Sequence, residues 1–295
     1  MEARHIAVAG VETRYVEAGP KEAPAIVLIP PGLFGTGTLA GLFCPTLALW
    51  DTAIPALAET NRVVALDTLG QGGTGAGGGE PTLDVALDHL AGFLDAMGIG
   101  RAHLVGHDEG AMLAVRLAFR DPARVASCTV VSSPTVAPSG DGLNPLFLAN
   151  PLEPRLSAQG QRWVVDRLSY TPHHATPALL EDAVAAAASG AAGALRQRLS
   201  GGGAMARLAG SVMKAKGDNF GRWRDEGFPV PAMVAWGTHD PTSGIAHART
   251  TLELIAVRQT AAQMHLINRA GYFAYREQPQ LFNGLVAGFV RALEG

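Results

Sequence analysis

Cysteine is almost missing from this chain, which has only Cys44 and Cys128 among its 295 residues. Two cysteines are too few for the disulfide framework that stabilises many small secreted domains. The first ten residues, MEARHIAVAG, contain charged side chains and no long apolar run, whereas a secretory signal requires such a run. We therefore expect a cytoplasmic protein.

Charged residues are also few, at 17% of the chain, and the formal net charge is -3. The basic residues are scattered, whereas a nucleic-acid or membrane-surface partner would require them in a stripe or cluster. We expect neither partner. With 47% hydrophobic residues, the chain is long enough to bury a full core. Its length favours one domain with an insertion over two equal domains, and it leaves open a monomer or a homodimer.

Apolar runs alternate with helix-like segments along most of the chain. Residues 5–17 alternate around Ala9-Gly10 and predict an antiparallel hairpin at a sheet edge. Further strands are predicted at residues 25–29, 62–66, 103–105, 125–131, 231–236 and 264–267, and helices at 50–59, 83–97 and 278–293. This order predicts an α/β fold with a mostly parallel sheet and helices on both of its faces.

The pattern changes between residues 135 and about 227, where buried strands disappear and helix signals accumulate. Ser157 precedes AQGQRWVVDRL, Thr176 and Pro177 open the next helical pattern, and an Ala/Leu-rich stretch continues to Lys216. We predict a helical insertion after the sixth strand. The core would then comprise residues 1–134 and 228–295, and the insertion residues 135–227.

The most informative stretch is AHLVGHDEGAMLAV, residues 102–115. It predicts a strand, a tight turn and a helix, with small residues at Gly106 and Gly110 where strand and helix meet closely. Asp108 stands in the middle of the turn. The stretch resembles the nucleophile elbow of the α/β-hydrolase family, in the branch with aspartate at this place, such as epoxide hydrolases and dehalogenases. A plain strand-to-helix turn around a solvent-facing Asp108 is the alternative.

The loop after the first buried strand supports the same resemblance. Residues 30–34, PPGLF, take the place of the family's His-Gly-X-Pro loop, whose backbone amide helps to hold a developing oxyanion. The resemblance implies that Leu33, or else Phe34, supplies this amide and that the amide of Glu109 supplies another. A rigid Pro-Gly loop without this role is the alternative. The following connection, residues 36–49, is longer than the family's and could shape the pocket.

The loop after the second buried strand contains a glycine motif. Its sequence resembles the family's Asp-X-X-Gly-X-Gly-X-Ser loop, and the segment from Gly70 to Gly75 also fits Gly-X-Gly-X-X-Gly. More glycines follow instead of a helix start, and the chain has no Gly-Lys-Ser/Thr, so dinucleotide and phosphate-loop sites are disfavoured. We interpret the loop as structural and expect no cofactor.

The family's catalytic residues occur in the order elbow residue, acid, base. Asp108 fills the first place, and Asp240, in Trp-Gly-X-X-Asp-Pro, fills the second. The third place should read Ala-Gly-His-Phe but has Tyr272 instead of histidine. A phenol, whose ordinary pKa is about 10, is a poor general base at neutral pH but a competent proton donor. We therefore expect Tyr272, oriented by Asp240, to act as an acid or hydrogen-bond donor.

The residue after the elbow departs from the family as well. Dehalogenases carry Trp or Arg there, and these side chains help to bind the leaving anion. An ionised Glu109 cannot do so, which disfavours halide release.

Another histidine could replace the missing base. His107 and His239 adjoin Asp108 and Asp240 but should point away from the site, because neighbours on an extended segment face opposite sides. His173 in the insertion could reach the site, as could the adjacent His174. A metal site is not expected, because no pair of His or acidic residues has ligand spacing on one predicted helix within the site.

The resemblance implies that the insertion is a cap that covers the active site. Its candidate pocket residues are Trp163, Tyr170, His173 and His174, with His107 contributing from the elbow. Ordinary packing is the alternative for each of them.

Three functions are compatible with these residues. The first is an enzyme that uses Asp108 for proton transfer or transient covalent attack on a hydrophobic small molecule, with Tyr272 as acid. Epoxide opening, carbon–carbon bond formation or cleavage, and cyclisation in a biosynthetic pathway all suit a carboxylate paired with a phenol. The second is a conventional epoxide or ester hydrolase with a relocated base. The third is a catalytically inactive binding protein, which two buried carboxylates disfavour.

Overall fold

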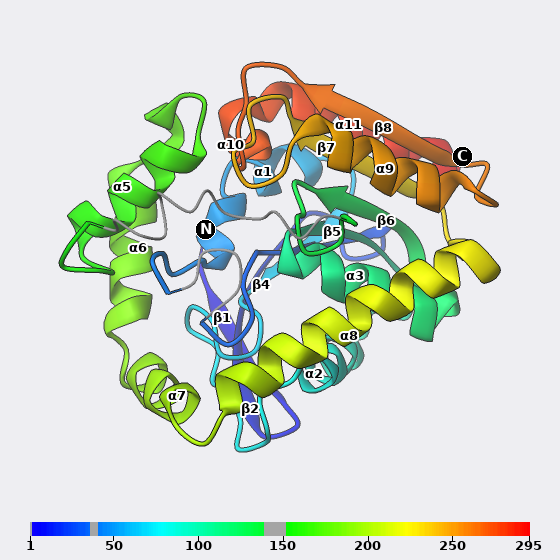
Figure 1. The fold of residues 1–295 in the computed structure, drawn as a ribbon. Coiled ribbons are helices and arrows are strands. Elements are labelled where there is room, and N and C mark those ends of the chain that lie inside the picture. Colours follow the sequence, from blue (N-terminus) through cyan, green and yellow to red (C-terminus); the bar gives the residue numbers. More distant parts are fainter. Residues whose placement is uncertain (1, 36–40, 139–151) are drawn as a thin grey trace.

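The computed structural model describes residues 2–35, 41–138 and 152–295. One eight-stranded sheet forms the centre, with helices packed around it (Figure 1). The strands are β1 (Arg4–Val8), β2 (Val11–Ala18), β3 (Ala25–Ile29), β4 (Arg62–Leu66), β5 (Ala102–His107), β6 (Val125–Val131), β7 (Ala232–Gly237) and β8 (Ala262–Ile267). The helices are α1 (Ile54–Leu57), α2 (Leu83–Ala96), α3 (Glu109–Arg120), α5 (Ala158–Leu168), α6 (Pro177–Ala188), α7 (Gly190–Ser200), α8 (Ala204–Asp225), α9 (Ile245–Ala256), α10 (Ala274–Glu277) and α11 (Pro279–Glu294).

The sheet has the order β1-β2-β4-β3-β5-β6-β7-β8. The predicted hairpin is confirmed, since β1 and β2 are antiparallel, and β2 joins β4 in the same manner. All other pairs are parallel. Every residue of β3, β5, β6 and β7 is buried, which explains their continuous apolar sequences. The prediction of a mostly parallel α/β fold is therefore confirmed.

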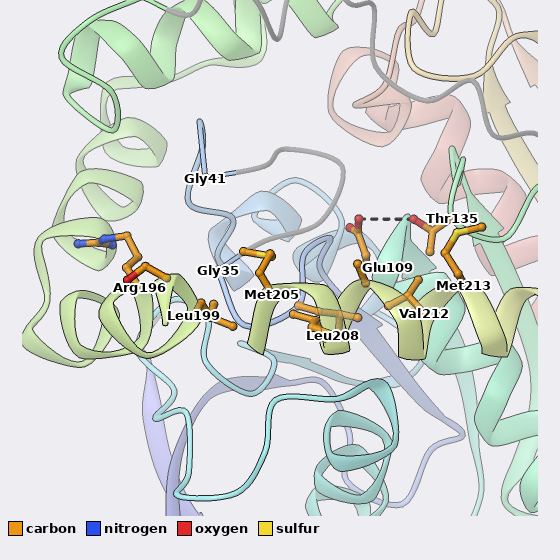
Figure 2. A pocket seen from close by; sticks show the side chains of 13 residues that line it. Gly35, Gly41, Glu109, Thr135, Arg196, Leu199, Met205, Leu208, Val212 and Met213 are labelled. Atoms are coloured by element: carbon orange, nitrogen blue, oxygen red, sulfur yellow. Dashed lines mark hydrogen bonds between the residues drawn. The ribbon is translucent and has the colours of Figure 1, made fainter. Parts of the chain in front are cut away.

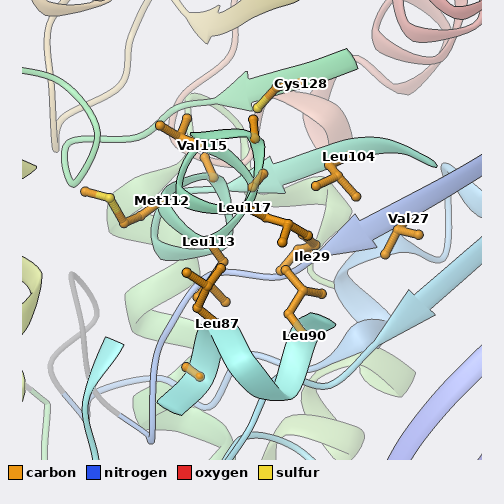
Figure 3. Packing of buried hydrophobic residues seen from close by; sticks show 14 of the residues in the cluster. Val27, Ile29, Leu87, Leu90, Leu104, Met112, Leu113, Val115, Leu117 and Cys128 are labelled. Atoms are coloured by element: carbon orange, nitrogen blue, oxygen red, sulfur yellow. The ribbon is translucent and has the colours of Figure 1, made fainter. Parts of the chain in front are cut away.

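The core lies between the sheet and the helices beside it. Figure 3 shows Val27 and Leu104 of neighbouring strands facing Leu113 of α3 and Leu90 of α2. Thr82 caps α2 by accepting a hydrogen bond from the amide of Val85, as the sequence predicts. The buried faces of α2 and α3 fix the elbow between β5 and α3 against the middle of the sheet.

Among the described residues, four helices, α5 to α8, lie between β6 and β7. Figure 1 shows α5, α6 and α7 along one side of the molecule and α8 crossing in front of α2 and α3. Ser157 caps α5, and Thr176 caps α6, as predicted. Helix α8 continues beyond Lys216 to Asp225, because the buried Trp223 anchors its last turns against Phe119.

The predicted helix at residues 50–59 is wrong in its extent. A 3-10 turn at Leu47–Trp50 and the one-turn helix α1 (Ile54–Leu57) replace it. Pro55 lies in the first turn of α1, where a missing N–H and a fixed φ are tolerated, so a helix cannot run through it from residue 50. Further 3-10 turns occur at Pro122–Arg124 and Pro172–His174.

Within the described residues, no single helix has both the length and the apolar character needed to cross a membrane. The pair α6 and α7 meets the length and composition criterion together, with a bend of 58° between its members.

Candidate active site

Asp108 occupies the turn between β5 and α3. Its φ of 50° lies in the left-handed region, which costs energy for any residue other than glycine. The amide of Asp108 donates to the carbonyl of Val131 at 3.1 Å, and the hydroxyl of Ser133 donates to the carbonyl of Asp108 at 2.9 Å. A Cβ at Gly110 would collide with the carbonyl oxygens of Ile29, the last residue of β3, and of Pro30, so glycine is required there. The turn therefore holds Asp108 rigidly at the carboxyl end of the sheet.

Tyr272 reaches Asp108 from the turn that follows β8. Its hydroxyl donates a hydrogen bond of 2.7 Å to Oδ2 of Asp108, and both residues are fully buried. Burial, and next the negative charge of Asp108, raise the pKa of Tyr272 well above its ordinary value. The phenol therefore keeps its proton and serves as a donor.

Thr135, which follows β6, contacts the other oxygen of the same carboxylate. Its hydroxyl lies 2.6 Å from Oδ1 of Asp108, and its amide donates to that oxygen at 3.3 Å. The same hydroxyl lies 3.4 Å from Oε1 of Glu109. The sequence reasoning missed Thr135. Its position just beyond the carboxyl end of a parallel strand, next to the elbow strand, was the available signal.

The side chain of Glu109 turns back toward the loop after β3. Its Oε2 accepts a hydrogen bond of 2.7 Å from the amide of Gly32, one residue before the predicted oxyanion amide of Leu33. Glu109 is only 3% exposed. The side chain of Glu109 is therefore part of the site, in addition to the backbone amide for which the sequence singled it out.

A cavity of about 810 Å³ adjoins these groups. Figure 2 shows Glu109 and Thr135 at one end and the apolar side chains of α7 and α8 along the wall. The lining residues are Leu33, Gly35, Gly41, Glu109, Thr135, Arg196, Leu199, Ser200, Met205, Leu208, Ala209, Val212 and Met213. Asp108 and Tyr272 are not among them. The guanidinium of Arg196 points away from the cavity and donates to the carbonyl of Ala187 at 2.9 Å.

Asp240 lies in the loop that follows β7 and does not hydrogen-bond to Tyr272. Its Oδ1 accepts from the amide and hydroxyl of Thr242 at 2.8 and 2.7 Å, and its Oδ2 has no hydrogen-bond partner among the described residues. Burial raises the pKa of Asp240 to about 7. The expected orientation of Tyr272 by Asp240 is therefore not what the structure shows, because the phenol points to Asp108 instead.

The elbow histidine, His107, is buried behind Tyr272. Its Nδ1 lies 3.1 Å from the hydroxyl of Tyr275, and its ring centroid lies 4.1 Å from that of Tyr272. Burial lowers the pKa of His107 to about 3, so the imidazole is neutral. His239 is exposed and its ring contacts Tyr170, as expected for a side chain that faces away from the site.

The predicted pocket residues of the insertion lie apart from the described cavity. His174 is buried, with Nε2 2.7 Å from the hydroxyl of Ser169, and burial lowers its pKa to about 3. His173 is exposed, and Trp163 lies beneath the guanidinium of Arg167. The cavity wall comes from α7 and α8 instead, so the pocket assignment of Trp163, Tyr170, His107, His173 and His174 has no support from this cavity. Phe34, the second candidate for the oxyanion amide, lines a smaller pocket instead. Of the connection that could shape the pocket, residues 36–40 fall outside the described part of the chain.

Lys216 is a further buried charge that the sequence did not indicate, because a single lysine near the end of an Ala/Leu-rich stretch carries no local signal. Its Nζ donates to the carbonyl of Pro134 at 2.9 Å. Burial lowers the pKa of Lys216, and the negative charge of Asp108 acts in the opposite direction. A cation therefore lies close to the elbow carboxylate. In the described ranges, no group of three or more His, Cys, Asp or Glu side chains is arranged to hold a metal ion.

Comparison with known proteins gives one family match. A family model described as alpha/beta hydrolase fold matches residues 25–275. Among curated proteins, the chain is 26% identical to 3-oxoadipate enol-lactonase 1 of Acinetobacter baylyi, over 94% of this chain and 92% of that protein. It is 29% identical to 2-hydroxymuconate semialdehyde hydrolase of a Pseudomonas species, over 82% of this chain and 81% of that protein.

Solved structures agree on the fold. A meta-cleavage product hydrolase from Pseudomonas fluorescens superposes with a TM-score of 0.77 at 24% identity, covering 98% of this chain and 97% of that chain.

Proposed function

Because the chain belongs to the α/β-hydrolase fold family, we propose that it is an enzyme that hydrolyses a hydrophobic small molecule without a catalytic histidine. Tyr272, Asp108, Thr135 and Glu109 would form one hydrogen-bonded acid–base site in place of the usual nucleophile and imidazole. This is the conventional hydrolytic interpretation with a relocated base.

The bond between Tyr272 and Asp108 carries the proposal. The hydroxyl of Tyr272 donates a hydrogen bond of 2.7 Å to Oδ2 of Asp108. In the proposed site, the phenol therefore occupies the place beside Asp108 that an imidazole would have. His107, the residue before Asp108, contacts the hydroxyl of Tyr275. Its imidazole is neutral, because burial lowers its pKa to about 3. A reaction in which imidazole activates water on an Asp108 ester therefore has no support from the arrangement of the described residues.

Two observations favour water as the second reactant and a hydrophobic compound as the first. Two of the similar curated proteins are named as a lactonase and a hydrolase. The cavity wall is dominated by Leu, Met, Val and Ala side chains, and two oxygen-bearing side chains, Glu109 and Thr135, face one end of it. This combination is typical of sites that bind an apolar molecule and orient one reactive group.

A non-hydrolytic reaction is the second candidate, and the tyrosine at position 272 favours it. A phenol that keeps its proton can donate to an oxygen while a carboxylate accepts elsewhere, which suits epoxide opening, carbon–carbon bond formation or cleavage, and cyclisation. The assignment of Asp108 to the aspartate-elbow branch, with epoxide hydrolases and dehalogenases, concerns hydrolytic enzymes and belongs to the first candidate.

The test is turnover of a panel of hydrophobic esters, lactones and epoxides, followed by mass spectrometry. We expect products whose summed mass exceeds that of the substrate by one water: two fragments from an ester, and one product from a lactone or epoxide. The Asp108→Asn/Glu109→Gln double variant should give no such products. Isomeric products of unchanged mass would favour the second candidate. Stoichiometric retention of ligands without any conversion would contradict both and indicate a binding protein.

A further inference from the structure

We propose that Glu109, rather than the elbow residue Asp108, is the catalytic carboxylate that meets the substrate, and that Asp108 is a positioning residue that acts through Thr135. The inference rests on the hydrolytic function proposed above and assigns the base that this function requires.

Access separates the two carboxylates. Asp108 is fully buried, and its oxygens are taken by the hydroxyls of Tyr272 at 2.7 Å and Thr135 at 2.6 Å. It does not line the 810 Å³ cavity, whereas Glu109 and Thr135 do (Figure 2). A substrate bound in this cavity therefore meets Glu109 first and would have to displace Thr135 to reach Asp108.

The side chain of Glu109 is held at one oxygen and has Thr135 beside the other. Oε2 accepts the amide hydrogen bond of Gly32 at 2.7 Å, and Oε1 lies 3.4 Å from the hydroxyl of Thr135. The backbone of Glu109 begins α3, directly after the strained turn. A base that is held at one oxygen by a backbone amide and lies beside an apolar cavity is preorganised for proton transfer.

Thr135 connects the two carboxylates. Its hydroxyl has one hydrogen and lies at 2.6 Å from Asp108 and 3.4 Å from Glu109, so the hydrogen goes to Asp108. The negative charges of Asp108 and Glu109 both raise the pKa of Tyr272, so both carboxylates interact electrostatically with the phenol. Asp108 and Tyr272 thereby hold the hydroxyl of Thr135 in place next to Glu109.

The chemical step needs only water and the substrate. Glu109 takes a proton from a water molecule while the water oxygen forms a bond to the electrophilic carbon of an ester or epoxide. The electron pair of the C–O bond that breaks stays on the departing oxygen. Glu109 then returns its proton to that oxygen, so the carboxylate is regenerated and one water is consumed.

The test compares kcat and KM of four variants with wild type on a substrate that wild type converts. Glu109→Gln keeps the size and an oxygen for the amide of Gly32 but cannot take a proton, so we expect kcat to fall by about 10²- to 10⁴-fold with KM nearly unchanged. Glu59→Gln, an exposed glutamate with no role in the site, is the matched control and should keep wild-type kcat. Thermal unfolding of each variant shows whether it is folded.

Variants of Thr135 and Asp108 test whether these residues position Glu109. We expect Thr135→Val to lower kcat by roughly tenfold and to shift the acid limb of the pH–rate profile, and Thr135→Ser to restore both. Asp108→Asn should cost less than Glu109→Gln. Wild-type kcat in a folded Glu109→Gln, or complete loss in Asp108→Asn alone, would overturn this inference while leaving the hydrolytic function standing. Absence of any turnover by wild type would instead refute the hydrolytic function.

Discussion

Tyr272 donates a short hydrogen bond to a buried carboxylate, and the strength of this contact can be measured. The phenol is fully buried and donates to Asp108 at 2.7 Å, and its raised pKa keeps the proton on it. A buried carboxylate needs such donors, because an unpaired ionised oxygen is expensive in a medium of low polarity. The hydroxyl of Tyr272 therefore stabilises Asp108 in the folded protein as well as shaping its reactivity.

Removing that hydroxyl should destabilise the protein. Tyr272→Phe leaves Oδ2 of Asp108 without its donor, so we expect the free energy of unfolding to fall by about 1–3 kcal/mol. Tyr275→Phe is the matched control: Tyr275 is also fully buried, but its hydroxyl pairs with the neutral His107. Urea denaturation at neutral pH measures both variants. A loss for Tyr272→Phe no greater than that for Tyr275→Phe would refute the charged role of Asp108.

Asp240 should make stability depend on pH in a known direction. Burial raises the pKa of Asp240 to about 7 from an ordinary value of about 4. Its contribution to stability is therefore complete below the ordinary pKa and is lost as the pH rises through about 7. The loss amounts to at most about 4 kcal/mol, at ~1.4 kcal/mol for each pKa unit.

Asp240→Asn isolates this effect, because the amide does not ionise. Subtracting the unfolding free energy of the variant from that of wild type should give a difference that decreases between pH 4 and pH 8. A difference that stays constant over this range would mean that Asp240 keeps its ordinary pKa. We further expect Asp240→Asn to reduce activity less than Glu109→Gln, because Asp240 does not line the cavity.

At the scale of secondary-structure elements, α8 decides what the cavity accepts. It contributes Met205, Leu208, Ala209, Val212 and Met213 to the wall, and its buried Lys216 lies near Asp108. Ala209→Trp should fill part of the cavity and raise KM for a bulky substrate about tenfold or more. Ala206→Trp, on the same helix but off the wall, is the control and should leave KM unchanged. Equal KM values for both variants would place the substrate elsewhere.

The sequence predicted those elements whose signals are local. The apolar strands, the Gly106 and Gly110 turn and the caps at Thr82, Ser157 and Thr176 follow from spacing and residue type, and the structure confirms them. The residues of the cavity wall could not be predicted from such local signals. Whether α5 or α8 lines the cavity depends on how helices far apart in the sequence pack onto the core. Likewise, the contact of Thr135 with Asp108 joins β6 to the elbow through tertiary packing.

For the whole molecule, the fold places the reactive groups but does not determine their roles. The chain belongs to the α/β-hydrolase fold family, but Asp240 contacts Thr242 and the phenol of Tyr272 contacts Asp108. Members of one fold family carry many chemistries, so function has to be argued from the site. Glu109 lines the cavity and Asp108 does not, and catalysis by one or the other carboxylate would leave solvent oxygen in different places.

The most direct measurement of that claim is a single turnover of an ester or epoxide in heavy-oxygen water, with enzyme in excess, followed by mass mapping of the peptide that contains residues 108 and 109. If Glu109 acts as a base toward water, the solvent oxygen should appear in the product and in neither carboxylate. If Asp108 attacks carbon and its ester is hydrolysed at the carbonyl, solvent oxygen should appear in the Asp108 carboxylate first. An unlabelled peptide with labelled product is the result we predict, and a labelled Asp108 would contradict the account.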